Sequence, residues 1–203
     1  MVKIEVRPLT AADRDDAVRC LAAAFHDDPV FNWLIGNPAD PLPRLRHAYG
    51  AFIDSTLRAP VHQTFVATAE GAIAGVAIWH AVDDWRMPLR EVVRSTPATL
   101  RAFGRRLPRA LRALGRIEKV HPEAPHWYLA YVGVDPASQG CGIGGHLMGA
   151  GLDQADREGV GAYLENSKPG NTPFYARHGF DPADAITIGA DAPPVLAMWR
   201  DPR

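Results

Sequence analysis

The chain has 203 residues and a formal net charge of −1, with 22 Lys and Arg against 23 Asp and Glu. This length suits one domain over residues 1–203 with its own core, and a hydrophobic content of 47% excludes a largely disordered chain. The near-zero charge excludes a protein that holds nucleic acid mainly through overall positive charge. No apolar run is long enough for a membrane span or a standard signal peptide, so we expect a cytoplasmic protein.

The N-terminal part predicts a strand, two helices and a β-hairpin, over residues 3–8, 10–25, 43–58 and 63–80. Alternating apolar and charged residues indicate the strand, and Thr10 can cap the first helix. A short aromatic segment separates the helices, and Pro43 suits the first turn of the second. Glu70-Gly71 joins two strand-like runs, which is typical of a hairpin.

Residues 86–119 predict a basic helical insertion. They contain nine Arg and one Lys against two Glu, a net charge of +8 that leaves −9 on the rest of the chain. Apolar residues recur at intervals of three and four, at Leu100, Phe103, Leu107, Leu111, Leu114 and Ile117. Pro108 marks a kink or a restart. Two interpretations stay open for the arginines: a solvated face on a covering helix, or a basic wall that attracts an anion.

The C-terminal part predicts a strand, a glycine loop that opens a helix to about residue 157, a strand, a short helix and two strands. We expect strands over residues 127–134, 162–165, 180–188 and 195–200, and the short helix over residues 172–178. A glycine loop between a strand and a helix predicts an anion site, because unpaired N–H groups and the helix dipole meet there.

Two ligand classes compete for this loop. Gly140-x-Gly142-x-x-Gly145 matches a dinucleotide fingerprint, and Glu165 follows Gly145 by 20 residues. The context fits that class poorly, because five residues separate the strand end at Val134 from Gly140. Only one βαβ unit is present as well, so the dinucleotide interpretation is the weaker one.

The competing pattern consists of three motifs: Val132-Gly133-Val134 followed by Gln139-x-x-Gly142-x-Gly144, then Leu164-Glu165-Asn166-Ser167, then Asn171 to Phe180. Together they resemble the GNAT superfamily of N-acetyltransferases, which bind acetyl-CoA. The resemblance implies an α/β (α+β) fold: a mixed central sheet of about seven strands flanked by helices, with a helical insertion between strands 3 and 4. Through residues 22–25 and 127–130 the chain is most similar to the puromycin N-acetyltransferase branch.

The resemblance implies that acetyl-CoA, the co-substrate, is held by Val132, Gly133, Val134, Gln139, Gly140, Cys141, Gly142, Ile143, Gly144, Gly145 and Asn171. The strand at 132–134 can pair its backbone with the pantetheine amides and place an N–H near Val134 against the thioester oxygen. That requires this strand to part from the one at 162–165, and Gly133 suits a local bulge.

Tyr175 and Glu165 are the candidate catalytic residues. By resemblance Tyr175 protonates the departing thiolate, and a phenol with a pKa of about 10 holds its proton at neutral pH. Glu165, at a strand end beside the cleft, is the candidate base for the amine, and a water relay is the alternative.

On the acceptor side, Asp27 and Asp28 can steer a cationic amine or simply end a helix. Trp33 and Trp79 are candidates for an apolar acceptor pocket. The histidines and cysteines show no metal-ligand spacing, so we expect no metal.

The predicted function is acetyl transfer to a primary amine of a small molecule, of antibiotic or nucleoside type, by a monomer or homodimer that contacts neither nucleic acid nor membrane. A protein N-acetyltransferase and a non-catalytic acyl-CoA sensor are the alternatives.

Overall fold

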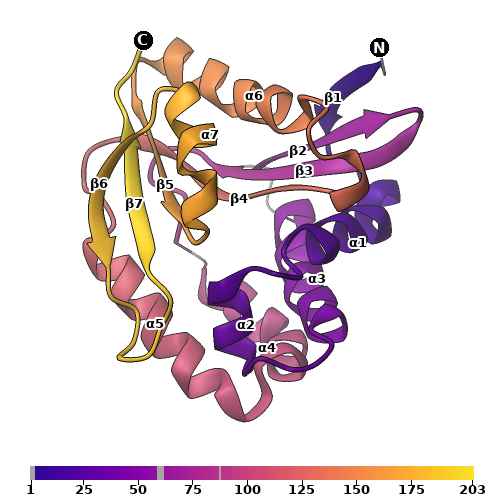
Figure 1. Cartoon of the computed structure of the whole chain (residues 1–203), viewed down its shortest axis with the longest axis vertical. Coiled ribbons are helices and arrows are strands. Elements are labelled where there is room, and N and C mark those ends of the chain that lie inside the picture. The colour runs from indigo at the N-terminus through magenta and orange to yellow at the C-terminus, as the bar shows by residue number, and fades with distance from the viewer. Residues whose placement is uncertain (1–2, 59–61, 87) are drawn as a thin grey trace.

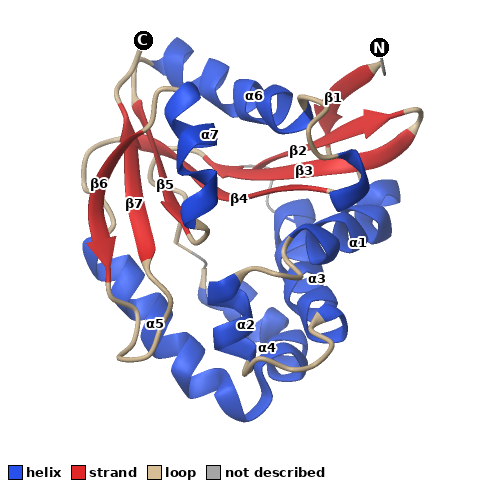
Figure 2. Ribbon diagram, viewed as in Figure 1, coloured by secondary structure: helices blue, strands red, loops and turns tan. Residues whose placement is uncertain are grey.

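The computed structural model describes residues 3–58, 62–86 and 88–203. In this part of the chain, seven strands form one sheet in the order β1-β2-β3-β4-β5-β7-β6 (Figures 1 and 2). The strands are β1 (Ile4–Pro8), β2 (His62–Ala69), β3 (Ala72–His80), β4 (His126–Val134), β5 (Gly161–Asn166), β6 (Asp181–Ile186) and β7 (Val195–Arg200). Strands β4 and β5 run parallel and the other neighbouring pairs run antiparallel. The predicted mixed sheet is therefore confirmed.

Helices cover both faces of this sheet (Figure 1). They are α1 (Arg14–Ala24), α2 (Pro29–Ile35), α3 (Leu42–Arg58), α4 (Leu89–Phe103), α5 (Leu107–Val120), α6 (Ile143–Glu158) and α7 (Thr172–Arg177). Helices α4 and α5 are the predicted insertion between β3 and β4, and Pro108 lies in the first turn of α5, so it restarts the helix. None of the helices within the described residues is long and apolar enough to cross a membrane.

The aromatic segment between the first two predicted helices is helix α2. Asp28 is its N-cap residue and accepts a hydrogen bond of 2.8 Å from the backbone N–H of Phe31. Pro29 occupies the first turn, where a missing N–H costs nothing, and Gly36 ends the helix in the left-handed conformation. Periodicity alone does not reveal a helix of seven residues, whereas these caps do.

Alternate residues of β3 join different cores, as expected when side chains point to opposite faces of a strand. Ala77 and Trp79 belong to the core cluster with α6, and Val76 and Ile78 belong to the cluster with α1 and α3. Trp79 is fully buried, and its indole occupies the space where a side chain on Gly151 of α6 would lie. Both faces of β3 are thus in the interior.

Strands β4 and β5 part midway along β4. They pair only from His126 to Leu129, and the rest of β4 pairs with β3 alone. The predicted separation is therefore confirmed, but the bulge lies at Ala130, which the register between β3 and β4 skips. Gly133 has a different role: a Cβ there would lie 2.8 Å from the Cβ of Ala24, so glycine lets α1 approach β4.

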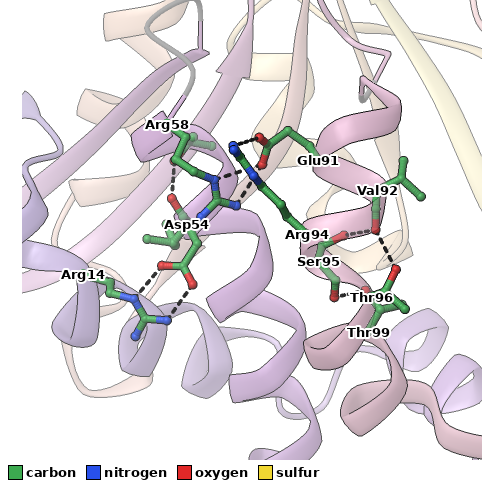
Figure 3. Close-up of polar contacts among 11 residues, drawn as sticks. Arg14, Asp54, Arg58, Glu91, Val92, Arg94, Ser95, Thr96 and Thr99 are labelled. Carbon is green, nitrogen blue, oxygen red and sulfur yellow. Dashed lines mark hydrogen bonds and ion pairs between the residues drawn. The ribbon is translucent and has the colours of Figure 1, made fainter.

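Ion pairs fasten the insertion to the rest of the protein (Figure 3). The carboxylate of Glu91, which is 4% exposed, accepts a hydrogen bond of 2.8 Å from Arg58 of α3 and one of 3.1 Å from Arg94. Arg58 in particular lowers the pKa of Glu91. Arg14 and Asp54, 2.6 Å apart, tie α1 to α3 in the same way. The insertion is thus attached to α3 through its buried Glu91, while Arg94 pairs with the same carboxylate within α4.

Candidate active site

A cavity of about 1210 Å³ connects the glycine loop with the helical insertion. Its first end is lined by the loop at 139–145 and by the parted end of β4, including Val132, Gly133 and Val134. Its other end is lined by residues of α2, α3, α4 and α5. Tyr175 and Glu165 line the same cavity, so the structure brings the two predicted catalytic residues and most of the predicted cofactor residues together.

The glycine loop leaves its backbone open to a ligand. Gly140 and Gly142 have φ angles of 80° and 86°, in the left-handed region that favours glycine, and a Cβ at either position would meet no atom within 4 Å. The side-chain amide of Gln139 donates to the carbonyl of Val134 at 3.2 Å, which fixes the loop to β4. Cys141 is exposed and does not line the cavity.

Helix α6 begins directly at this loop, with Gly142 as its N-cap residue. Its first N–H groups, at residues 143–145, have no partner within the helix, and the helix dipole adds partial positive charge. Gly144 packs against Phe174, since a Cβ there would lie 3.2 Å from that ring. The residues present therefore fit a pyrophosphate group, which needs N–H donors and room for close approach to the backbone.

The parted edge of β4 provides the second part of a cofactor site. Beyond Leu129 this strand pairs with β3 on one side only, so alternate N–H and C=O groups face the parted side. An extended chain with amide groups, such as pantetheine, can bind to such an edge as an added strand does. Asn171, just before α7, also lines the cavity.

Tyr175 is held by aromatic packing on α7. Its ring lies 5.3 Å from that of Phe174 and 6.3 Å from that of Phe180, measured between centroids. The residue is 7% exposed, and burial raises the pKa of the phenol above its usual value. The hydroxyl group therefore keeps its proton at neutral pH and can donate it inside the cavity.

Glu165 points one carboxylate oxygen at a hydrogen-bond donor and leaves the other without one. Its side chain is 9% exposed, and Oε2 accepts a hydrogen bond of 2.7 Å from the hydroxyl of Tyr128. Burial, reinforced by the Glu165 charge, raises the pKa of Tyr128, so Tyr128 stays a donor. Atom Oε1 is buried without a hydrogen-bond partner and lies 3.6 Å from Nδ1 of His121. The carboxylate can therefore accept a proton.

Comparisons with known proteins show the family of this chain. The family model for acetyltransferases of the GNAT type matches residues 24–180. The chain belongs to the acetyltransferase (GNAT) family. An uncharacterized N-acetyltransferase from Schizosaccharomyces pombe is 28% identical over 204 residues, which cover 95% of this chain and 81% of that protein.

Solved structures extend the likeness to the fold. The crystal structure of "histone acetyltransferase HPA2 and related acetyltransferase" from Corynebacterium glutamicum is 30% identical, with a TM-score of 0.76 and coverage of 100% of this chain and 98% of that one. The PaiA N-acetyltransferase from Thermoplasma acidophilum in complex with coenzyme A shares the fold at 12% identity, with a TM-score of 0.60 and coverage of 98% and 99%. This chain is thus an acyltransferase of a family that uses acetyl-CoA.

The predicted acidic residues of this acetyltransferase already have partners. Asp28 is fully buried, where it caps α2 and accepts a hydrogen bond of 2.5 Å from the hydroxyl of Ser167, and burial raises its pKa. Asp27 pairs with Lys168 at 2.7 Å, which lowers the pKa of Asp27. Both carboxyl groups join the turn before α2 to the segment after β5. Asp28 lines the cavity, whereas Asp27 does not.

The two predicted pocket tryptophans do not line the cavity. Trp79 is buried in the core against α6, which corrects its assignment to the acceptor site. Trp33 is 9% exposed in another core cluster, and the guanidinium of Arg109 lies over its ring at 4.4 Å. Large aromatic side chains gain most from complete burial, and that is the reason for both corrections. Trp85 does line the cavity, stacked on His121.

The acceptor end is apolar and is built largely by the insertion. Most of the predicted apolar stripe lines the cavity: Phe103, Leu107, Leu111, Leu114 and Ile117. Leu111 and Leu114 are 58% and 50% exposed, so among residues 3–58, 62–86 and 88–203 nothing covers this stretch of the stripe. No group of three or more His, Cys, Asp or Glu in the described part of the chain is placed to hold a metal ion.

Three residues near Glu165 carry no sequence signal. His121 follows α5, His126 begins β4, and Tyr128 lies two residues further along. The two histidines flank a short loop with two prolines and match no motif. Only the topology, which sets the start of β4 beside β5, brings them to Glu165.

Proposed function

We propose that this protein transfers an acetyl group from acetyl-CoA directly to a primary amine of a small molecule, of antibiotic or nucleoside type. The observation that carries this proposal is the continuous cavity, which joins a pyrophosphate-type loop to an apolar acceptor end past Tyr175 and Glu165. We further propose that residues 1–203 act as one cytoplasmic domain that contacts neither nucleic acid nor membrane, as a monomer or homodimer.

The glycine loop and the N-terminus of α6 would hold the pyrophosphate of the co-substrate. The parted edge of β4 would pair with its pantetheine arm, and Asn171, which lines the same cavity, would contact that arm. Bound acetyl-CoA supplies an activated thioester. An N–H near Val134 would stabilise the negative charge that develops on the thioester oxygen, as donors aimed at that position do in acyl transfer.

Proton transfers would be the task of Glu165 and Tyr175. Glu165 removes a proton from the ammonium form of the acceptor, because only the neutral amine has a lone pair for attack. Tyr175 gives its proton to the departing thiolate. Because burial makes this phenol a weak acid, its proton moves only as negative charge develops on sulfur. The surplus proton of the new amide nitrogen then returns to Tyr175.

An apolar acceptor end favours a small molecule with an apolar body over a polycation. Apart from Glu165, the carboxylates that line the cavity are Asp28, which Ser167 and the α2 backbone engage, and Glu118. A polyamine or a lysine-rich peptide would need more negative charge than this. The resemblance to the puromycin branch supports the same choice and remains a prediction. A peptide acceptor and a non-catalytic sensor stay as alternatives.

Thiol release from acetyl-CoA, followed with a panel of amines, tests the proposal. The panel contains apolar primary amines, polyamines and peptides with a free N-terminus. We expect the apolar amines to stimulate release most strongly. If calorimetry shows that coenzyme A binds but no amine stimulates thiol release, the protein is a sensor. If only peptides stimulate thiol release, it is a protein acetyltransferase.

A further inference from the structure

Two histidines outside any motif lie next to Glu165: His121 faces Glu165 at the wall of the cavity, and His126 lies behind His121. Atom Nδ1 of His121 lies 3.6 Å from Oε1 of Glu165, and its Nε2 lies 3.0 Å from Nε2 of His126. The side chain of His121 is 2% exposed, and its ring stacks on Trp85 with centroids 3.8 Å apart. This packing fixes the orientation of the imidazole.

The hydrogen bonds determine where the protons of both rings are. Atom Nδ1 of His126 lies 2.6 Å from the carbonyl oxygen of Ala124, and a carbonyl only accepts, so this nitrogen carries a proton. Burial lowers the pKa of His126, so its ring is neutral and its Nε2 is an acceptor. The Nε2 of His121 must therefore donate to His126. A neutral His121 then has a bare lone pair on Nδ1, facing Glu165.

No proton lies between Nδ1 of His121 and Oε1 of Glu165 in this arrangement. The lone pair of His121 and Oε1 of Glu165 face each other, and Oε1 accepts no hydrogen bond. The hydroxyl of Tyr163 is likewise buried without a partner, and burial together with the neighbouring Glu165 carboxylate raises the pKa of Tyr163. The second oxygen of Glu165 is already held by Tyr128. A proton placed between Nδ1 and Oε1 would convert two facing acceptors into an imidazolium–carboxylate pair with a charge-assisted hydrogen bond.

We propose that Glu165 and His121 together form the proton acceptor for the amine, with Glu165 receiving the proton and His121 retaining it at Nδ1. The inference rests on the proposed function, because it names the base that the proposed acetyl transfer needs. His121 acts through Glu165 and is a positioning residue, while His126 fixes which nitrogen of His121 is free. The sequence-based alternatives, Glu165 alone or a water relay, need neither histidine.

The proton balance of the step is complete. The ammonium R–NH₃⁺ gives one proton through Oε1 of Glu165 to Nδ1 of His121, and the neutral amine forms the C–N bond with the thioester carbon. The C–S bond breaks, its electron pair goes to sulfur, and the sulfur takes the proton of Tyr175. The nitrogen returns its surplus proton to Tyr175, and His121 releases its proton to water.

Several titratable groups surround the pair and bear on any pH profile. They are His126, Tyr128 and Tyr131 from β4, Tyr163 from β5, and His80 and Asp83 from the end of β3 and the turn after it. Burial raises the pKa of Tyr128 and Tyr163 above the usual value, so neither loses its proton near neutral pH. NMR signals assigned to individual residues separate the protonation of these groups from that of His121.

The variants His121→Gln and Glu165→Gln test the pair. A glutamine at 121 can still donate toward His126 but binds no proton, so we expect kcat to fall by about 10²-fold or more. We also expect the acid limb of the kcat/KM profile to shift. The double variant should be no slower than Glu165→Gln alone, because the two residues act as a unit. His146→Gln, on the exposed part of α6, is the matched control and should behave as wild type.

Nitrogen-15 NMR of the histidine rings gives a readout that needs no acetyl transfer. At neutral pH we expect His121 to carry its proton on Nε2 and His126 on Nδ1. A proton on Nδ1 of neutral His121 would overturn the inference. This NMR experiment uses the wild-type protein, so it tests the inference even if His121→Gln does not fold.

The outcomes separate this inference from the function on which it rests. If wild-type protein releases no thiol with any amine, the proposed function fails and the inference falls with it. If wild type transfers acetyl groups and His121→Gln matches it in kcat and pH profile, the inference alone is refuted.

Discussion

Gly133 lets helix α1 lie against strand β4, and its replacement by alanine tests how the fold shapes the cavity. The added Cβ would lie 2.8 Å from Cβ of Ala24 and 3.2 Å from side-chain carbons of both Leu21 and Phe25. Carbon atoms in van der Waals contact are about 3.5–4.0 Å apart, so α1 must move outward by roughly 1 Å. Overpacking of this kind costs about 1–3 kcal/mol of unfolding free energy. Ala24 and Phe25 also line the cavity, so coenzyme A affinity should fall as well.

Urea unfolding followed by tryptophan fluorescence measures the loss of stability, and calorimetry measures coenzyme A binding. Gly149→Ala is the matched control: it lies within α6, and a Cβ there meets no atom within 4 Å. Alanine should stabilise that helix position by about 0.5–1 kcal/mol. If Gly133→Ala keeps both wild-type stability and wild-type affinity, the reasoning about this contact is refuted.

Three further variants probe other parts of the structure. Asp13→Asn should destabilise the protein at pH 7, because Arg7 holds the pKa of Asp13 below its usual range. That stabilisation is present above the unfolded-state pKa of about 4 and is lost as the pH falls through the folded pKa, so urea midpoints of variant and wild type should converge in acid. Glu91→Gln weakens the pair with Arg58 and should speed amide exchange in α4 more than elsewhere; uniform exchange would contradict this. Gly142→Ala, at a φ of 86°, should cost about 1–2 kcal/mol by strain alone, measured in urea, and weaken coenzyme A binding.

Most of the predicted fold follows from signals that lie within a few neighbouring residues of the sequence. Glu70 and Gly71 both adopt positive φ, 52° and 84°, as expected for a tight hairpin turn. The glycine loop and the start of α6 also follow from local composition, because few other residues tolerate the backbone at Gly140 and Gly142. The bulge at Ala130 is not predictable in this way, since it arises from the register between β3 and β4.

The predicted site is less complete because its parts meet through tertiary structure. Residues near the glycine loop are contiguous in sequence and can be read directly. His121 reaches Glu165 only because the insertion ends where β4 begins beside β5. Periodicity likewise identifies an apolar stripe but not what covers it, so Leu111 lines a cavity rather than a core. Trp79 shows the converse, an aromatic residue that packs under α6 instead of facing a ligand.

The most direct test of the account is the effect of Tyr175→Phe on kcat, compared with its effect on acetyl-CoA affinity. Tyr49→Phe, a buried tyrosine that does not line the cavity, is the control for loss of a hydroxyl group. We predict that Tyr175→Phe lowers kcat by about 10²-fold or more while the Kd for acetyl-CoA changes little. A wild-type kcat in Tyr175→Phe would contradict the assignment of Tyr175 as the acid that protonates coenzyme A.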